Sequence, residues 1–321
     1  MRLIPLPHAT CHAHALACIV LCLLVSACGT GIEVTEHVTD KDVRRVMEKN
    51  GVNQTTVTLT PFEDPLQSWR VGKRFWVADD RVRELMVNQL DCDLDTVHLA
   101  GHVLSFLSSE TTPLFADDDY RIDITFEDVA DGHRYVYRYG LAQRTDRSYI
   151  SLPMLVDMDL VAHIARQIQD KDYYIRTSIW YDRDNDQMKD GRQFVKVHID
   201  SVLPGNAILP LKVLFTTIDT RERAMVWMSD NASTMHGRDF DALFVANDPH
   251  LSYPLIGDDN WRLITCSQVV EGMTKEECLL SLGTPKHIVE RPEQGGLKEY
   301  WYYDGGSYLY FVDGLLTQFR R

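Results

Sequence analysis

Two glycine-containing turns divide the end of this chain into short strands. The segments 298–303, 307–312 and 315–320 alternate apolar and polar residues, and Asp304-Gly305-Gly306 and Asp313-Gly314 separate them. Asp-Gly and Gly-Gly pairs adopt the positive backbone angles that tight hairpins require. We therefore predict a three-stranded antiparallel meander, and such a sheet must bury one face against other elements.

A short helix is predicted just before the meander, at 275–282. Thr274 and Glu277 have the spacing of a capping box, in which each residue satisfies a backbone amide of the other. Gly283 fits the left-handed position that ends a helix, and Pro285 prevents the helix from resuming. Gly272 loosens the preceding chain so that Met273 can pack against the helix. We interpret the stretch 271–288 as structural, with no catalytic role.

The C-terminal region resembles a known family. Its motifs are Gly272-Met273-Thr274, Leu282-Gly283-x-Pro285, Trp301-x-Tyr303 and Phe311-x-Asp313-Gly314-Leu315. Together they resemble the SmpA/OmlA (BamE-like) family of outer-membrane lipoproteins, over residues 259–321. The resemblance implies two helices packed on the meander, and a role in binding proteins close to the membrane, without enzyme chemistry.

The start of the chain has the pattern of a secretory signal peptide over residues 1–27. Arg2 precedes an apolar run, Ala15–Val25, which is shorter than the roughly 20 residues that span a bilayer. The junction Val25-Ser26-Ala27-Cys28 resembles the bacterial lipoprotein signal, which implies acylation of Cys28 and anchoring in membrane lipid. Gly29 in place of Asp favours the outer membrane by the same resemblance. The alternative is an ordinary cleaved signal peptide in which Cys28 has no special role.

The remaining chain predicts a β-rich α+β protein built from several modules. We expect a tether with a short helix at 28–66, a first β module at 67–139, a second β module with one amphipathic helix at 140–258, and the C-terminal domain at 259–321. The segments 117–140 and 171–200 echo each other in aromatic strands and Asp-Gly loops. Tandem SH3-like barrels would explain this echo, and a single larger β domain is the alternative.

Charge and motif spacing bear on the possible ligands. The formal net charge of −14 argues against nucleic acid, because phosphate contacts need clustered Lys and Arg. Asp182, Asp184 and Asp186 alternate as in a calcium loop, but Gln187 and Gln193 occupy the positions where an EF-hand has glycine and glutamate. We predict a solvated hairpin loop there, with an irregular metal site as the alternative, and we predict no cofactor.

These patterns together favour a non-enzymatic envelope lipoprotein. We expect it to bind other envelope proteins or to support assembly of an outer-membrane complex, and the face of the membrane stays open. A glycan- or peptidoglycan-binding lipoprotein is one alternative, since exposed aromatic rings stack on sugars. A hydrolase with dispersed carboxylates is the other, and it needs a pocket with two carboxyl groups and no basic partner. Cys266 and Cys278 are either bridged or free thiols.

Overall fold

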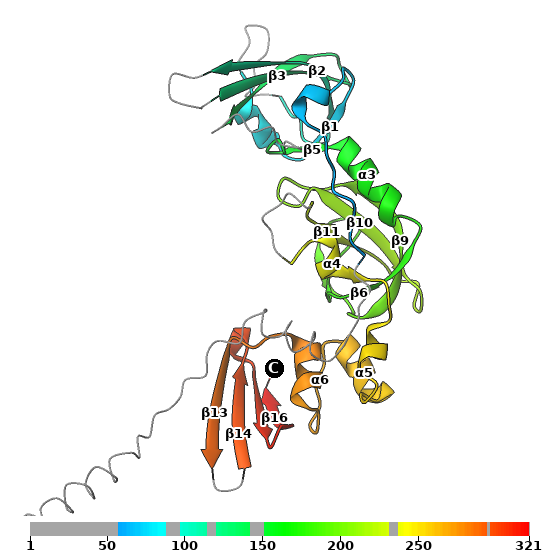
Figure 1. The fold of residues 1–321 in the computed structure, drawn as a ribbon, viewed down its shortest axis with the longest axis vertical. Coiled ribbons are helices and arrows are strands. Elements are labelled where there is room, and N and C mark those ends of the chain that lie inside the picture. Colours follow the sequence, from blue (N-terminus) through cyan, green and yellow to red (C-terminus); the bar gives the residue numbers. More distant parts are fainter. Residues whose placement is uncertain are drawn as a thin grey trace, which may run out of the picture.

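The structure of this protein is a computed structural model, which describes residues 57–87, 97–113, 120–141, 151–230, 237–293 and 296–320. It contains three antiparallel sheets that follow one another along the long axis of the molecule (Figure 1). The β-rich α+β fold predicted from the sequence is confirmed. The predicted signal peptide, Cys28 and most of the tether lie outside the described residues.

The first sheet has five strands in the order β4-β3-β2-β1-β5. The strands are β1 (Arg74–Val77), β2 (Val103–Pro113), β3 (Tyr120–Asp128), β4 (Arg134–Leu141) and β5 (Leu155–Asp157). Because β5 pairs with β1, the first module reaches Asp157 and the predicted boundary between residues 139 and 140 is wrong. Strand β5 has only three residues, too few for alternation to identify it, and its partner β1 lies far away in sequence.

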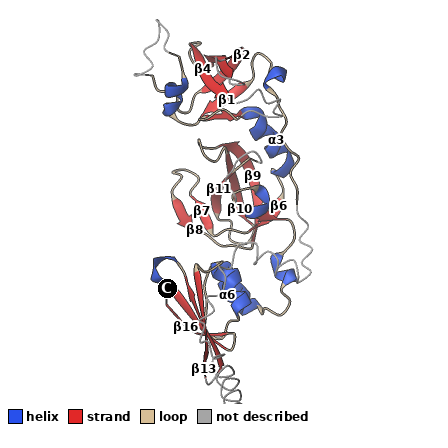
Figure 2. Ribbon diagram, turned by 60° about the vertical axis from the view of Figure 1, so that its left-hand side comes forward, coloured by secondary structure: helices blue, strands red, loops and turns tan. Residues whose placement is uncertain are grey.

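Helix α3 (Met158–Ile168) follows directly and lies beside the first two sheets (Figure 2). Its four apolar residues at helical spacing are all buried: Leu160, Val161, Ile164 and Ile168. The carboxylate of Asp157 caps the helix by accepting from the backbone amide of Asp159 at 2.8 Å. The predicted amphipathic helix is therefore present, with its apolar face in the second core.

The second sheet has seven strands in the order β12-β6-β9-β10-β11-β7-β8. Its elements are β6 (Asp172–Ile175), β7 (Ile179–Tyr181), β8 (Met188–Asp190), β9 (Val195–Pro204), β10 (Leu211–Thr217), β11 (Arg223–Met228), the short helix α4 (Phe240–Leu243) and β12 (Phe244–Val245). The two sheets have separate buried cores, which favours two modules over one domain. Their strand orders differ, however, so the sequence echo does not reflect one repeated topology. In the first sheet the matching segments form a single hairpin, whereas in the second the β7–β8 hairpin is inserted between them.

The C-terminal unit has helices α5 (Asp258–Thr265) and α6 (Lys275–Leu282) against one face of a sheet (Figure 1). The sheet contains β13 (His287–Glu293), β14 (Gly296–Tyr302), β15 (Tyr308–Val312) and β16 (Leu315–Arg320), in that order. The prediction of two helices on an antiparallel meander is confirmed, but the sheet has a fourth strand, β13. That strand contains Pro292, which normally counts against a strand but is tolerated at a sheet edge, where β13 lies.

The predicted structural residues act as expected in this unit. The Thr274 amide donates to Glu277 Oε2 at 2.7 Å, and the Glu277 amide donates to Thr274 Oγ1 at 3.2 Å, which completes the capping box. Gly283 ends α6 with a φ of 78°. Asp313 and Gly314 both have positive φ, as the β15–β16 hairpin requires. Met273 and Trp301 are buried in the same core as α6, and Pro285 is also buried. Gly272 is exposed, has a φ of 93° and donates its amide to the carbonyl oxygen of Leu316.

Buried polar contacts join the second and third units. The Gln193 side-chain amide donates to the carbonyl oxygens of Ile264, Leu280 and Ser281, at 3.0, 2.9 and 2.9 Å. Next to it, the ring of Phe194 stacks on Trp261 with a centroid separation of 5.7 Å. These contacts fix both helices of the C-terminal unit against the second sheet. None of the described helices is long and apolar enough to cross a membrane.

Candidate functional site

The three aspartates of the calcium-like loop do not converge on one point. Asp182 Oδ1 accepts from the backbone amides of Asp184 and Asn185 at 2.9 and 3.2 Å, so it closes its own turn. Asp186 instead contacts Lys212, with Oδ1 2.6 Å from Nζ. Within the described ranges, no group of three His, Cys, Asp or Glu side chains is arranged to hold a metal ion. The loop is an exposed connection between β7 and β8.

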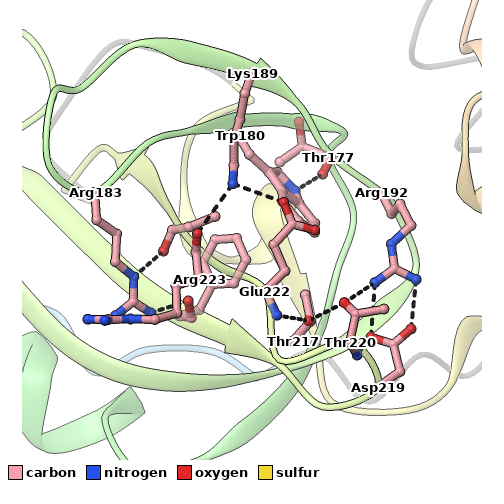
Figure 3. Close-up of polar contacts among 12 residues, drawn as sticks. Thr177, Trp180, Arg183, Lys189, Arg192, Thr217, Asp219, Thr220, Glu222 and Arg223 are labelled. Carbon is pink, nitrogen blue, oxygen red and sulfur yellow. Dashed lines mark hydrogen bonds and ion pairs between the residues drawn. The ribbon is translucent and has the colours of Figure 1, made fainter.

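A polar network next to this loop links the β7–β8 hairpin to the β10–β11 hairpin (Figure 3). The Arg192 guanidinium donates two hydrogen bonds to the Asp219 carboxylate, at 2.6 and 2.9 Å, and Lys189 Nζ lies 2.9 Å from Glu222 Oε1. The Arg192 guanidinium lowers the pKa of Asp219 to about 2. Each of these cations is matched by a carboxylate of the opposite hairpin. The network therefore fastens the two hairpins together and offers no reactive group.

A second charged cluster lies where the first sheet meets α3. Lys73 is almost fully buried, and its ammonium lies 2.7 Å from Asp157, 2.8 Å from Asp64 and 2.9 Å from Asp159. Burial alone would lower the pKa of Lys73, but the charge of Asp157 and the hydrogen bonds to Asp157, Asp64 and Asp159 together outweigh burial, and the pKa is raised. Burial raises the pKa of Asp157, and this effect outweighs the lowering by the Lys73 ammonium and by the backbone amide of Asp159.

Three aromatic rings complete the surroundings of this ammonium. Their centroids lie 5.2 to 5.8 Å from Lys73 Nζ, and the rings belong to Phe62, Trp69 and Phe75. The cluster joins the segment before β1, strand β1 itself, and the start of α3. Its geometry is that of a buried structural link between the first and second units.

A surface pocket of about 470 Å³ lies on the second unit, between β6, β9 and the segment 246–252. Asp172 and Asp248 both line it, so it tests the hydrolase alternative. Asp172 contacts His198 at 2.9 Å and Lys196 at 3.2 Å, and these partners lower its pKa. A catalytic acid needs a raised pKa, and the hydrolase alternative requires two carboxyl groups without a basic partner. Asp172 has a lowered pKa and two basic partners, so this pocket does not support the hydrolase alternative.

The outward face of the C-terminal sheet is the strongest candidate for a binding site. The helices cover the other face, where Trp301, Leu309, Phe311 and Leu316 are buried. Because side chains alternate along a strand, Tyr300 and Tyr302 on β14 point outward, opposite Tyr310 and Tyr308 on β15. The structure thus gathers four tyrosines on one exposed surface.

Cations surround these tyrosines. Arg291 on β13 has its guanidinium carbon 5.8 Å from the Tyr300 ring centroid, Lys298 is the β14 residue paired with Arg291, and Arg320 on β16 is paired with Tyr308. We call the outward side chains of these four tyrosines and three cations the tyrosine face. At the outward register positions of the four strands, the acidic residue is Glu293, which lies at the end of β13 opposite Gly296. An aromatic, basic surface therefore lies on a chain with a net charge of −14.

Neither this surface nor Lys73 was predicted from the sequence. The signal for the tyrosines is present in the sequence, since Tyr300-x-Tyr302 and Tyr308-x-Tyr310 each place two rings on one face of a strand. No family model, no curated protein and no solved structure matches the chain.

Proposed function

We propose that this protein is a lipid-anchored envelope protein that binds another protein through the tyrosine face. The anchor is argued from the sequence, in which an apolar run ends at Val25-Ser26-Ala27-Cys28. Several acyl chains at Cys28 would give persistent membrane attachment, because each buried methylene contributes about 0.8 kcal/mol. The expected location is the outer membrane, by resemblance of the signal.

The observation that carries the binding role is the composition of the tyrosine face. Tyr and Arg are enriched at the energetic centres of protein interfaces, since they combine a large apolar area with polar tips. Tyr302 keeps 41% of its surface exposed, and the other three tyrosines of the face are partly buried. The face lies on a sheet that two helices support from behind, so a partner meets a rigid surface.

Buried links support the same role. Lys73 joins the first unit to α3, and Gln193 joins the second unit to the third. Such links hold the three sheets in series (Figures 1 and 2). A series of fixed units holds the tyrosine face in a defined position relative to the first two sheets.

The anchor and the binding role are tested separately in cells of a Gram-negative host. Mass spectrometry of the mature protein should find an acylated Cys28, and the Cys28→Ala variant should move from the membrane fraction to the soluble fraction. An unmodified thiol at Cys28 would refute the anchor. For the binding role, a photo-crosslinking amino acid at Tyr302 should yield a protein adduct that the same amino acid at Arg74 does not. Equal adducts at both positions, or none at Tyr302, would refute binding through the tyrosine face.

A further inference from the structure

We infer that the tyrosine face takes an acidic, extended protein segment, which adds to the sheet along β16. This inference rests on the proposed function, because it specifies the chemistry of the partner that the tyrosine face binds. Three features of the C-terminal unit carry it: the charge of the tyrosine face, the arrangement of its rings, and the edge strand beside it.

The positive charge of the tyrosine face favours a partner with negative charge. Arg291, Lys298 and Arg320 surround the tyrosines, and these three cations outnumber the acidic outward position, Glu293, at the end of β13. A surface of this sign attracts acidic segments and disfavours basic ones. A second copy of this chain, docked through the same face, would place these cations against their own equivalents. The expected partner is therefore a different chain.

The rings favour a protein over a glycan. The centroids of Tyr300 and Tyr310 are 4.6 Å apart with an interplanar angle of 31°. Two rings that lay flat and side by side could not approach this closely, so these two turn their faces toward each other. Their outer edges and hydroxyl groups are left for a partner. Edges and hydroxyls suit peptide groups, whereas sugar rings stack on open aromatic faces.

The edge strand supplies main-chain partners that only a polypeptide can use. Strand β16 is at the end of the sheet order, and its Leu316 exchanges backbone hydrogen bonds with Gly272 and Met273 at 2.7 Å. Beyond Leu316, no described strand pairs with the outer edge of residues 317–320. An extended segment can pair there and direct alternate side chains toward Arg320 and the tyrosines. Phe319, 38% exposed, offers an apolar contact on the opposite side of the same edge.

The test uses the purified full chain and a random peptide library displayed on phage. We expect the selected peptides to be rich in Asp and Glu, and a synthetic copy of the most enriched one to bind less tightly as salt is raised. Fluorescence anisotropy would then compare Tyr302→Ser, Arg320→Glu and the control Arg74→Glu. Both variants in the face should weaken binding about tenfold or more, and the control, with the same change in charge on the first sheet, should not.

The outcomes separate this inference from its rivals. Selection of neutral or basic peptides, or equal binding by all variants, would overturn it. Binding of polygalacturonate or of anionic lipid vesicles that Arg320→Glu abolishes, with no peptide selected, would assign the face to a glycan or to membrane lipid instead. Self-association that Tyr302→Ser abolishes, measured by sedimentation equilibrium, would assign it to a second copy.

Failure here would leave the proposed function standing if crosslinks at Tyr302 in cells still reached a protein. That result would mean that the partner is recognised by other chemistry. Loss of those crosslinks would instead refute the proposed binding role itself. The two failures are therefore distinguishable.

Discussion

Replacing Lys73 with methionine is expected to destabilise the junction between the first sheet and α3 by about 3 to 4 kcal/mol at neutral pH, because it leaves a buried carboxylate without its cation. The Asp157 side chain is 1% exposed and its Oδ2 has no hydrogen-bond partner. Without Lys73, Asp157 keeps the backbone amide of Asp159. Asp64 and Asp159 are more exposed, so their loss of a partner adds little.

Protonation of Asp157 sets an upper limit on this loss. An unfolded Asp has a pKa of about 3.9, so neutralising it at pH 7 takes about three units at 1.36 kcal/mol each, or about 4 kcal/mol. If Asp157 is protonated in the folded variant and ionised in its unfolded state, the folded state binds one more proton. The stability of the variant then rises as pH falls, by about 1.4 kcal/mol per unit between pH 7 and pH 4. The deficit relative to wild type should shrink accordingly.

Hydrogen exchange followed by mass spectrometry would measure this loss locally, in peptides that cover β1 and β5. Arg74→Met is the matched control, since Arg74 is the next residue, an exposed cation at the start of β1, and its loss should change little. The double variant Lys73→Met with Asp157→Asn should recover most of the stability and lose the dependence on pH. A deficit below about 1 kcal/mol for Lys73→Met, or one that is constant between pH 7 and pH 4, would refute the reasoning.

Three further predictions concern buried groups. Gln193→Leu removes the donor to three carbonyl oxygens, so it should weaken the contact between the second and third units by about 1 to 3 kcal/mol. Proteolysis between these units should then be faster, and an unchanged rate of cleavage would contradict this. Gly191→Ala would place its Cβ 2.0 Å from the Trp180 ring, so we expect a lower melting temperature and a changed near-ultraviolet circular dichroism signal. A melting curve like that of the wild type would contradict this and would show that the ring has room to move. Burial raises the pKa of Cys278 to about 12, so maleimide at pH 8 should label the exposed Cys266 and should not label Cys278 until the protein is denatured. A disulfide between the two cysteines, or equal labelling of both, would contradict this prediction.

Local patterns predicted the elements of this protein better than their pairing. The capping box of Thr274 and Glu277 and the Asp313-Gly314 turn are properties of a few adjacent residues, and both were predicted correctly. Strand β5 was missed because three residues carry no periodicity, and β13 was missed because it contains Pro292. The first error also misplaced a module boundary, since a boundary depends on which strands pair.

The sequence by itself determined where strands, turns and helix caps form, because backbone preferences and the alternation of side chains are local. It also placed Tyr300-x-Tyr302 and Tyr308-x-Tyr310 at spacings that put each pair on one side of a strand. Only the tertiary structure decided that β14 and β15 lie in register, with the four rings on the face opposite the helices. It likewise decided that Lys73 meets Asp157, which lies 84 positions later in the chain. Such contacts depend on the packing of distant segments, since the free energy of burying apolar faces is gained only when whole elements come together.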